Sequence, residues 1–294
     1  MRQRTIARSV EATGIGIHKG RPIRITLEPM GTDSGILFCH AEHDIEIPLS
    51  VENVVNTARA TVIGKAQAEI STIEHLLAAV YAYGIDNMRI TVEGDEIPVM
   101  DGSAISFCLL LDEAGIRMQT NPKRVLRIKR AVEVKEGKRF VRLEPSEKSS
   151  FLLDIAFPHP AIGQQSCVYD FGKQRFVEEI ARARTFGFAK DIQSLQSRNL
   201  ALGASLQNAI GLDSRRVLNR EGLRFDNEFA RHKILDVMGD MMVTGYHIVG
   251  KYSAFASSHA LNHALTKSVL GDNENYELLT IQELNDPAYG VCFA

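Results

Sequence analysis

Residues 71–84 read STIEHLLAAVYAYG, and their apolar spacing predicts a helix that ends at the final glycine. Before this helix, apolar and polar residues alternate at 23–27 and 45–47, which is typical of half-buried antiparallel strands. After it, DNMRITVEG at 86–94 predicts a strand, and 103–114 predicts a second helix that also ends at a glycine. The first part of the chain is therefore expected to begin with strands and to continue as helix, strand and helix.

The second part of the chain has the same order of elements without a repeat of the residues. Its predicted strands and helices are 125–134, 139–145, 151–157, 176–183, 226–244 and 246–255, of which 176–183 and 226–244 are the helices. Between the two parts, QTNPKR at 119–124 is polar and contains Pro122, so we place a domain boundary there. The sequence predicts an α+β fold of two packed α+β domains, residues 1–121 and 125–294.

The composition excludes several classes of protein. The 294 residues are 45% hydrophobic and 24% charged with a formal net charge of −2, which excludes disorder as the main state and gives no reason to expect a nucleic acid as partner. No apolar run approaches the ~20 residues of a membrane span, and the N-terminus lacks the apolar core of a signal peptide. The four cysteines form no CxxC pair, which argues against a disulfide framework and a thiolate zinc site. We expect a soluble, cytoplasmic protein that acts as a monomer.

The predicted helix from residue 226 carries three polar residues at helical spacing. His232, Asp236 and Asp240 follow one another at four-residue steps and share one face. A histidine and a carboxylate one turn apart can bind the same metal ion, with Asp240 in a supporting position. The alternative is a solvated helix face with an ion pair between Lys233 and Asp236.

Glu74 and His75 are the second candidate pair. Ser71 and Glu74 have the spacing of a capping box, which would give Glu74 a structural role at the helix start. A histidine beside a glutamate is also what a metal hydrolase needs when one residue binds the ion and its neighbour removes a proton from water. The remaining ligands must then come from elsewhere in the chain.

The segment SSHALNH, residues 257–263, predicts a third helix start. Ser257 and Ser258 can cap it, and His259 lies in the first turn, where the helix dipole lowers the pKa of a histidine. A carboxylate such as Asp240 would raise that pKa again and make His259 a candidate acid. The alternative is an ordinary surface histidine.

Two phenylalanines flank Gly187 in RARTFGFAKDI, residues 182–192. Phe186 and Phe188 alternate as on a strand or tight loop. They can stack on the ring of a ligand, or they can fill the core, as most buried aromatic residues do.

Five ordered motifs carry a resemblance that covers nearly the whole chain. TIEHLLAA, MDGSA, ARARTFGF, RVLNREGLRFDNEFARHKILDVMGD and SHALN run in this order from residue 72 to 263, and they resemble the UDP-3-O-acyl-N-acetylglucosamine deacetylase family. The resemblance implies a zinc-dependent enzyme that removes acetate from UDP-3-O-(3-hydroxyacyl)-N-acetylglucosamine, a committed step of lipid A synthesis in Gram-negative bacteria. It also implies two α+β domains, each with a small insert, that enclose the active site.

The resemblance assigns a role to each polar candidate. It implies three ligands for one Zn²⁺, a site at which Fe²⁺ can compete: His75, His232 and Asp236. Glu74 would be the general base and His259 the general acid or electrostatic partner, oriented by Asp240. Thr185 and Lys233 would line the catalytic centre. The implied substrate contacts are Phe186, Phe188, Ile192 and Lys233.

The implied substrate has a pyrophosphate at one end and a long acyl chain at the other. Candidate partners for the anion are Lys233, Arg182 and Arg184. Candidate walls of an acyl passage are Ile192, Leu195 and Leu200. The chain departs from the family pattern at Ser258, which stands where glycine is usual, and at Ala204, which replaces a glycine and would affect the preferred acyl length if it lines the passage.

Two other functions fit the same residues. A zinc amidohydrolase acting on another acylated sugar would use the same ligands and base. A non-catalytic protein that binds nucleotide sugars would use the polar residues only for structure.

Overall fold

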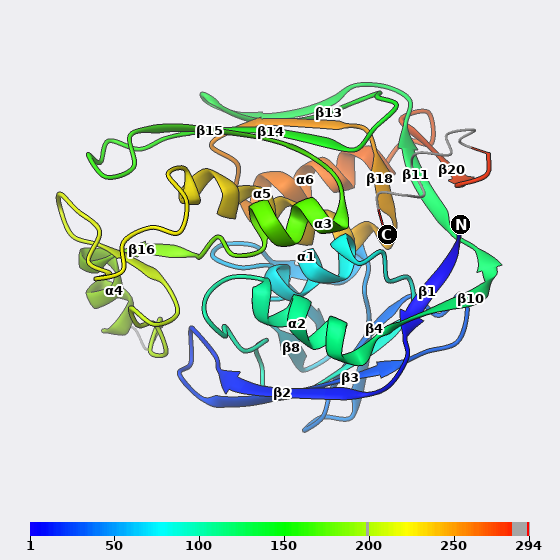
Figure 1. Ribbon diagram of the computed structural model, residues 1–294, viewed down its shortest axis with the longest axis horizontal. Coiled ribbons are helices and arrows are strands. Elements are labelled where there is room, and N and C mark those ends of the chain that lie inside the picture. The colour runs from blue at the N-terminus through cyan, green and yellow to red at the C-terminus, as the bar shows by residue number, and fades with distance from the viewer. Residues whose placement is uncertain (198–199, 284–292, 294) are drawn as a thin grey trace.

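Figure 1 shows the computed structural model, which describes residues 1–197, 200–283 and 293. The molecule is layered: a five-stranded sheet lies on each outer side, and the main helices lie between the two sheets. The buried apolar residues form one continuous core that includes both parts of the chain. None of the helices in the described ranges is long and apolar enough to span a membrane.

The two large sheets have the same topology. The first has the order β2-β3-β9-β4-β5 and the second β12-β13-β19-β14-β15, and in each the third and fourth strands are the one parallel pair. The strands of the first sheet are β2 (Val10–Ile15), β3 (Pro22–Pro29), β4 (Ile36–His40), β5 (Ile45–Pro48) and β9 (Met88–Glu93). Those of the second are β12 (Val132–Glu136), β13 (Arg139–Glu144), β14 (Ser150–Ala156), β15 (Gln164–Asp170) and β19 (Lys251–Phe255). The predicted α+β class and the shared order of elements are confirmed.

The helices between the sheets come in two pairs. They are α1 (Glu74–Ala82) and α2 (Ile105–Ala114) from the first part, and α5 (Glu228–Met241) and α6 (His259–Leu270) from the second. The helix predicted at 226–244 is confirmed, because the short helix η3 (Met242–Thr244) continues α5 up to Gly245. The helix predicted at 176–183 is shorter than expected: α3 (Lys173–Arg175) continues as a π-helical turn, η2 (Phe176–Ile180).

Smaller sheets complete each part. The first part adds β1 (Arg2–Ile6) paired with β10 (Ile116–Pro122), the turn η1 (Val51–Asn53) and an insert of β6 (Val54–Asn56), β7 (Val62–Lys65) and β8 (Ala68–Ile70). The second adds β11 (Arg124–Ile128) between β18 (His247–Val249) and β20 (Tyr276–Thr280), and an insert of β16 (Phe186–Phe188), α4 (Ala189–Gln196) and β17 (Ile210–Leu212).

The segment at the proposed domain boundary is not a loop. Residues 119–122 end β10, which pairs with β1 of the first part, and Arg124 begins β11, which pairs only with strands of the second part. Lys123 between them is buried, and its Nζ lies 2.6 Å from Asp86 Oδ1. The pairing partners of the strands change at this residue, and the division into residues 1–121 and 125–294 stays a prediction.

The central contact of the fold joins α1 to α5. Every residue of α1 is buried, as expected for a helix packed on all sides. On α5, Gly239 faces the backbone of Glu74, and a Cβ atom at position 239 would lie only 1.9 Å from the Glu74 carbonyl oxygen. The lack of a side chain therefore allows the two helices to approach backbone to backbone.

We predict that Gly239→Ala forces α1 and α5 apart. Overpacking in a close-packed interior should lower the free energy of unfolding by about 1–3 kcal/mol, measured by urea denaturation. Gly172→Ala is the matched control, because a Cβ there would meet its nearest neighbours at 3.9 Å. Equal stability of the Gly239→Ala variant and the wild type would contradict this account of the contact.

Candidate active site

Three side chains that could hold a metal ion meet where α1 crosses α5. His75 lies in the first turn of α1, and His232 and Asp236 lie one turn apart on α5. Asp236 Oδ1 is 3.3 Å from His232 Nε2 and 3.7 Å from His75 Nε2, and all three side chains are buried. Their ligand atoms lie within 4.8 Å of one another, so one ion can contact all three.

The chemistry of these side chains fits a divalent cation. Burial lowers the pKa of His75 to about 3 and also lowers the pKa of His232, so both imidazoles are neutral and can donate a lone pair. His232 Nδ1 lies 3.0 Å from the Ala183 carbonyl oxygen, which can accept a hydrogen bond from the Nδ1–H group and so leaves Nε2 free for an ion. Two neutral histidines and a carboxylate are the ligand set of an open catalytic zinc site.

Asp236 is held in its ionised form. Burial by itself would raise its pKa, but the neighbouring His232 and Lys233 side chains keep that pKa well below the ordinary value. Lys233 Nζ lies 2.7 Å from Asp236 Oδ2, while Oδ1 faces the histidines. The predicted ion pair between Lys233 and Asp236 is therefore present, and it does not exclude a metal because it uses the other oxygen.

Glu74 faces the same centre and does not cap its helix. The residue before α1 is Ile73, which makes no side-chain cap, and Ser71 Oγ donates to the Asp95 carbonyl oxygen. The capping-box alternative is wrong. Glu74 Oε2 instead accepts a hydrogen bond of 3.0 Å from the Thr61 amide, and burial raises the pKa of Glu74 to about 7.

His259 and Asp240 form a buried pair opposite Glu74. His259 Nδ1 lies 2.9 Å from Asp240 Oδ2, and His259 Nε2 lies 3.7 Å from Glu74 Oε1. Burial opposes the charged form, yet the two carboxylates raise the pKa of His259 to about 10. The approach of Asp240 expected from the sequence is present and favours the charged form of His259, which is buried and not a surface histidine.

Ser258 does not displace His259. Its backbone is extended, with φ at −149°, and its side chain accepts a hydrogen bond from the Leu261 amide as the N-cap of α6. A serine therefore fits at this position without backbone strain and caps the helix that begins with His259.

Thr185 is held in place by the MDGSA motif. The Thr185 amide donates to the Gly102 carbonyl oxygen at 2.8 Å, and Gly102 has φ +83°. A Cβ at position 102 would lie 2.0 Å from the Asn208 carbonyl oxygen, so the motif requires glycine there. The hydrogen bond from Thr185 to Gly102 holds Thr185 on the wall of the cavity that reaches Glu74 and His75.

That cavity, of about 170 Å³, extends from the candidate ligands into the second insert. Its lining residues are Ile17, His18, Arg59, Ala60, Thr72, Glu74, His75, Val99, Thr185, Phe186, Gly187, Ile192, Leu195, Ala201, Ala204 and Ala209. The predictions of Ile192, Leu195 and Ala204 as lining residues agree with this wall, whereas Leu200 lines an adjoining hollow. The lining residues from the first part, such as Ile17 and Arg59, could not be predicted from the sequence, because no local pattern marks them.

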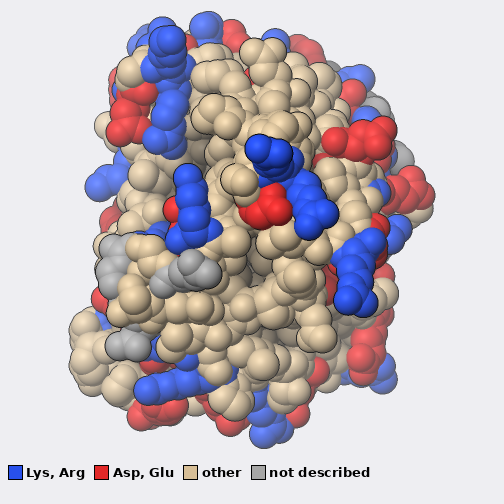
Figure 2. All heavy atoms as spheres, turned by 90° about the vertical axis from the view of Figure 1, so that its left-hand side faces the viewer, with Lys and Arg blue, Asp and Glu red and all other residues tan. Residues whose placement is uncertain are grey.

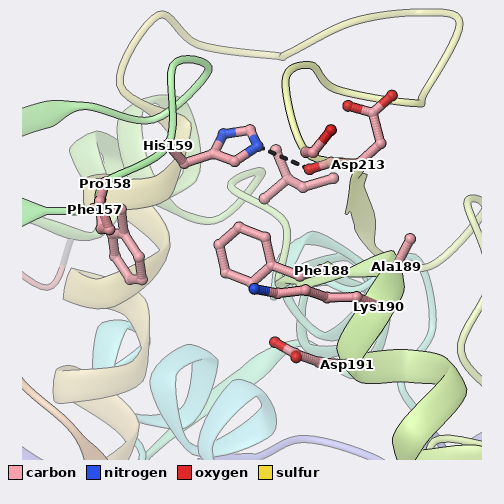
Figure 3. Close-up of a pocket in the computed structure, with 10 residues that line it drawn as sticks. Phe157, Pro158, His159, Phe188, Ala189, Lys190, Asp191 and Asp213 are labelled. Carbon is pink, nitrogen blue, oxygen red and sulfur yellow. Dashed lines mark hydrogen bonds between the residues drawn. The ribbon is translucent and has the colours of Figure 1, made fainter.

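A second hollow of about 610 Å³ lies beside α4 (Figure 3). Its walls include Phe157, Phe188, Lys190 and Asp191, and His159 Nε2 lies 2.9 Å from the Asp213 carbonyl oxygen. Phe188 therefore lines this hollow and not the cavity at the ligands.

Phe186 lies between the second hollow and the cavity that reaches His75. Its ring packs edge to face against Phe157, with centroids 5.8 Å apart, and Lys233 Nζ lies 5.9 Å from its centroid. Figure 2 shows this end of the molecule, where Lys and Arg side chains lie around a region of mostly uncharged atoms. The site thus has an apolar cavity on one side and an aromatic hollow on the other.

Arg184 has a structural role. Its guanidinium is buried and bonds to Glu228 Oε1 at 2.9 Å, to Glu221 Oε1 at 2.8 Å and to the Gly222 carbonyl oxygen at 2.8 Å. Arg184 is thus held by acceptors of its own chain, which argues against the expectation that it binds an anion. The Arg184–Glu228 pair instead ties the RARTFGF segment to the first turn of α5.

Comparison with known proteins identifies the family. A family model described as UDP-3-O-acyl N-acetylglycosamine deacetylase matches residues 3–271. A protein of this name, UDP-3-O-acyl-N-acetylglucosamine deacetylase, from Sulfurovum sp. (strain NBC37-1) is 61% identical over 294 residues, which is 100% of both chains. Those from Campylobacter curvus (strain 525.92) and Campylobacter jejuni (strain RM1221) are 56% and 51% identical, over 96% and 100% of both chains. The chain belongs to the UDP-3-O-acyl N-acetylglycosamine deacetylase family.

Proposed function

We propose that this chain hydrolyses the N-acetyl group of UDP-3-O-(3-hydroxyacyl)-N-acetylglucosamine to give acetate and UDP-3-O-(3-hydroxyacyl)-glucosamine, the committed step of lipid A synthesis. The observation that carries this proposal is the meeting of three candidate ligands with a buried glutamate and a buried histidine beside a largely apolar cavity. We further propose that it acts as a cytoplasmic monomer; the buried free thiols of Cys39, Cys108 and Cys167 suit a reducing compartment.

His75, His232 and Asp236 are the proposed ligands of one Zn²⁺, with Fe²⁺ as the competing ion. When bound, such an ion supplies Lewis-acid chemistry: it polarises the acetyl carbonyl and makes water more acidic.

Glu74 is the proposed general base. Oε2 is fixed by the Thr61 amide, which leaves Oε1 to take the proton of the attacking water. Its pKa of about 7 means that this carboxylate can both accept a proton and release it again near neutral pH.

His259 is the proposed cationic partner. Its Nε2 points towards Glu74 while Asp240 holds Nδ1, so its positive charge offsets the negative charge that develops on the acetyl oxygen or on the nitrogen. The amine must be protonated before it leaves, and either His259 Nε2 or Glu74 Oε1 delivers that proton. The Thr185 hydroxyl offers a further hydrogen bond to the reacting carbonyl.

The cavity at the candidate ligands and the aromatic hollow beside α4 suit the two ends of this substrate. The acyl chain is proposed to lie in the 170 Å³ cavity against Ile192 and Leu195, where most of the wall is apolar. The nucleotide end is proposed to lie towards the aromatic hollow of Phe188, with Phe186 against the sugar and Lys233 near the anionic group.

We predict that His75→Ala and His232→Ala abolish both stoichiometric zinc and acetate release while the fold survives. Metal analysis, far-UV circular dichroism and mass spectrometry of the product, with and without added zinc, measure these three properties. His40→Ala is the control, because His40 is equally buried on β4 but lies outside the proposed ligand set, and it should retain zinc.

Retained activity in both ligand variants would overturn the proposed site. If UDP-sugar binding survives a chelator and no product forms, the chain is a non-catalytic binding protein. If zinc is bound but only another acylated amide is cleaved, the substrate assignment is wrong and the metal chemistry stands.

We predict that Ala204→Leu shortens the acyl chain that the enzyme accepts. The substitution adds three carbon atoms to the wall of a cavity of about 170 Å³, so kcat/KM should fall by about tenfold or more for long acyl chains and little for short ones. Leu202→Ala is the control, since Leu202 is exposed and does not line this cavity. An equal change for all chain lengths would contradict the assignment of the cavity to the acyl chain.

A further inference from the structure

Thr61 contacts both carboxylates that the proposed chemistry uses. It precedes β7 in the insert of the first part and is 2% exposed. Its amide donates to Glu74 Oε2 at 3.0 Å, and its hydroxyl donates to Asp240 Oδ1 at 2.5 Å. One residue of the first part thus reaches a base on α1 and a carboxylate on α5.

Asp240 is held by donors on both of its oxygens. His259 Nδ1 lies 3.0 Å from Oδ1 and 2.9 Å from Oδ2, and Asn262 Nδ2 donates to Oδ2 at 2.8 Å. The Tyr252 hydroxyl donates to Asn262 Oδ1, which turns the amide nitrogen of Asn262 towards Asp240. His259 and Asn262 of the second part therefore hold this carboxylate, and the Thr61 hydroxyl adds a donor from the first part at Oδ1.

These contacts form a closed network of four polar residues. It runs from Thr61 to Glu74, across 3.7 Å from Glu74 Oε1 to His259 Nε2, through Asp240 and back to the Thr61 hydroxyl. All four residues are buried, so water cannot easily replace a lost hydrogen bond. A substitution at Thr61 should therefore affect the positions of both Glu74 and His259.

We propose that Thr61 is a positioning residue, which holds the Asp240–His259 pair in register with Glu74 across the interface of the two halves. This inference rests on the proposed function, because it assumes that Glu74 and His259 act together on the substrate. A hydroxyl that served only to satisfy a buried carboxylate would affect stability without affecting turnover.

Thr61 contacts Glu74 through its backbone amide and Asp240 through its hydroxyl, so a side-chain substitution can test the hydroxyl alone. Thr61→Val keeps the shape and the amide and removes only the donor to Asp240, whereas Thr61→Ser keeps that donor. Supporting hydrogen bonds of this kind are typically worth 10- to 100-fold in activity, so Thr61→Val should lower kcat by about 10- to 100-fold. KM should stay within about twofold, zinc content should be unchanged and Thr61→Ser should restore most of kcat.

Thr5→Val is the matched control for a buried hydroxyl. Thr5 lies on β1, is fully buried and accepts a hydrogen bond of 3.1 Å from the Met30 amide. Its loss should lower the melting temperature and leave kcat at the wild-type value. If Thr61→Val also leaves kcat unchanged, or if Thr61→Ser is impaired as strongly as Thr61→Val, the proposal is wrong.

Two further measurements separate positioning from a general structural effect. In an Asp240→Ala background, Thr61→Val should lower kcat by less than about twofold, because the contact from Thr61 to His259 through Asp240 is already absent. If kcat instead falls by the same factor as in the wild-type background, the proposal is wrong. In the metal-free protein, Thr61→Val should shift the NMR signal of the His259 Nδ1 proton by more than its linewidth. An unshifted signal refutes the positioning role, and this readout does not depend on whether the wild type deacetylates the proposed substrate.

Discussion

The contact between Gly239 of α5 and the Glu74 backbone of α1 determines how closely the two halves of the molecule approach. His75 follows Glu74 directly, and Asp236 lies one turn before Gly239, so the same contact that closes the interface brings the ligands within reach of one another. The distance between the helices at this point therefore limits the distance between the candidate metal ligands. A larger residue at position 239 would alter packing and site geometry together.

Burial gives the charged groups around this contact different states from those they have in water. Glu74 is raised in pKa to about 7 because its carboxylate is removed from solvent, whereas His259 is raised to about 10 because two carboxylates face it despite its burial. The proposed base, whose pKa lies near neutral pH, is thus 3.7 Å from a histidine whose charged form is favoured. This pairing suits a reaction in which a proton moves while negative charge develops nearby.

The sequence predicts well what depends on local spacing and poorly what depends on distant partners. The four-residue step from His232 to Asp236 predicted a shared face, and the structure has both on α5, with their nearest atoms 3.3 Å apart. The capping box at Glu74 failed because the amide of Thr61, thirteen residues earlier, binds the carboxylate instead. Thr61 itself carries no local pattern, and the burial of Arg184 against Glu228 joins residues 44 positions apart, so neither role could be predicted from the residues nearby.

The twofold repeat of the architecture explains why such distant contacts decide the site. Each half has the same sheet topology, yet the first half supplies one proposed ligand and the proposed base, and the second supplies two proposed ligands and the His259–Asp240 pair. Neither half has a complete site. An ion held by His75 together with His232 and Asp236 binds only to docked halves, and by linkage its binding free energy adds to the free energy that keeps them docked. The stability of the interface between the two halves and the occupancy of the proposed metal site then depend on the same docking equilibrium.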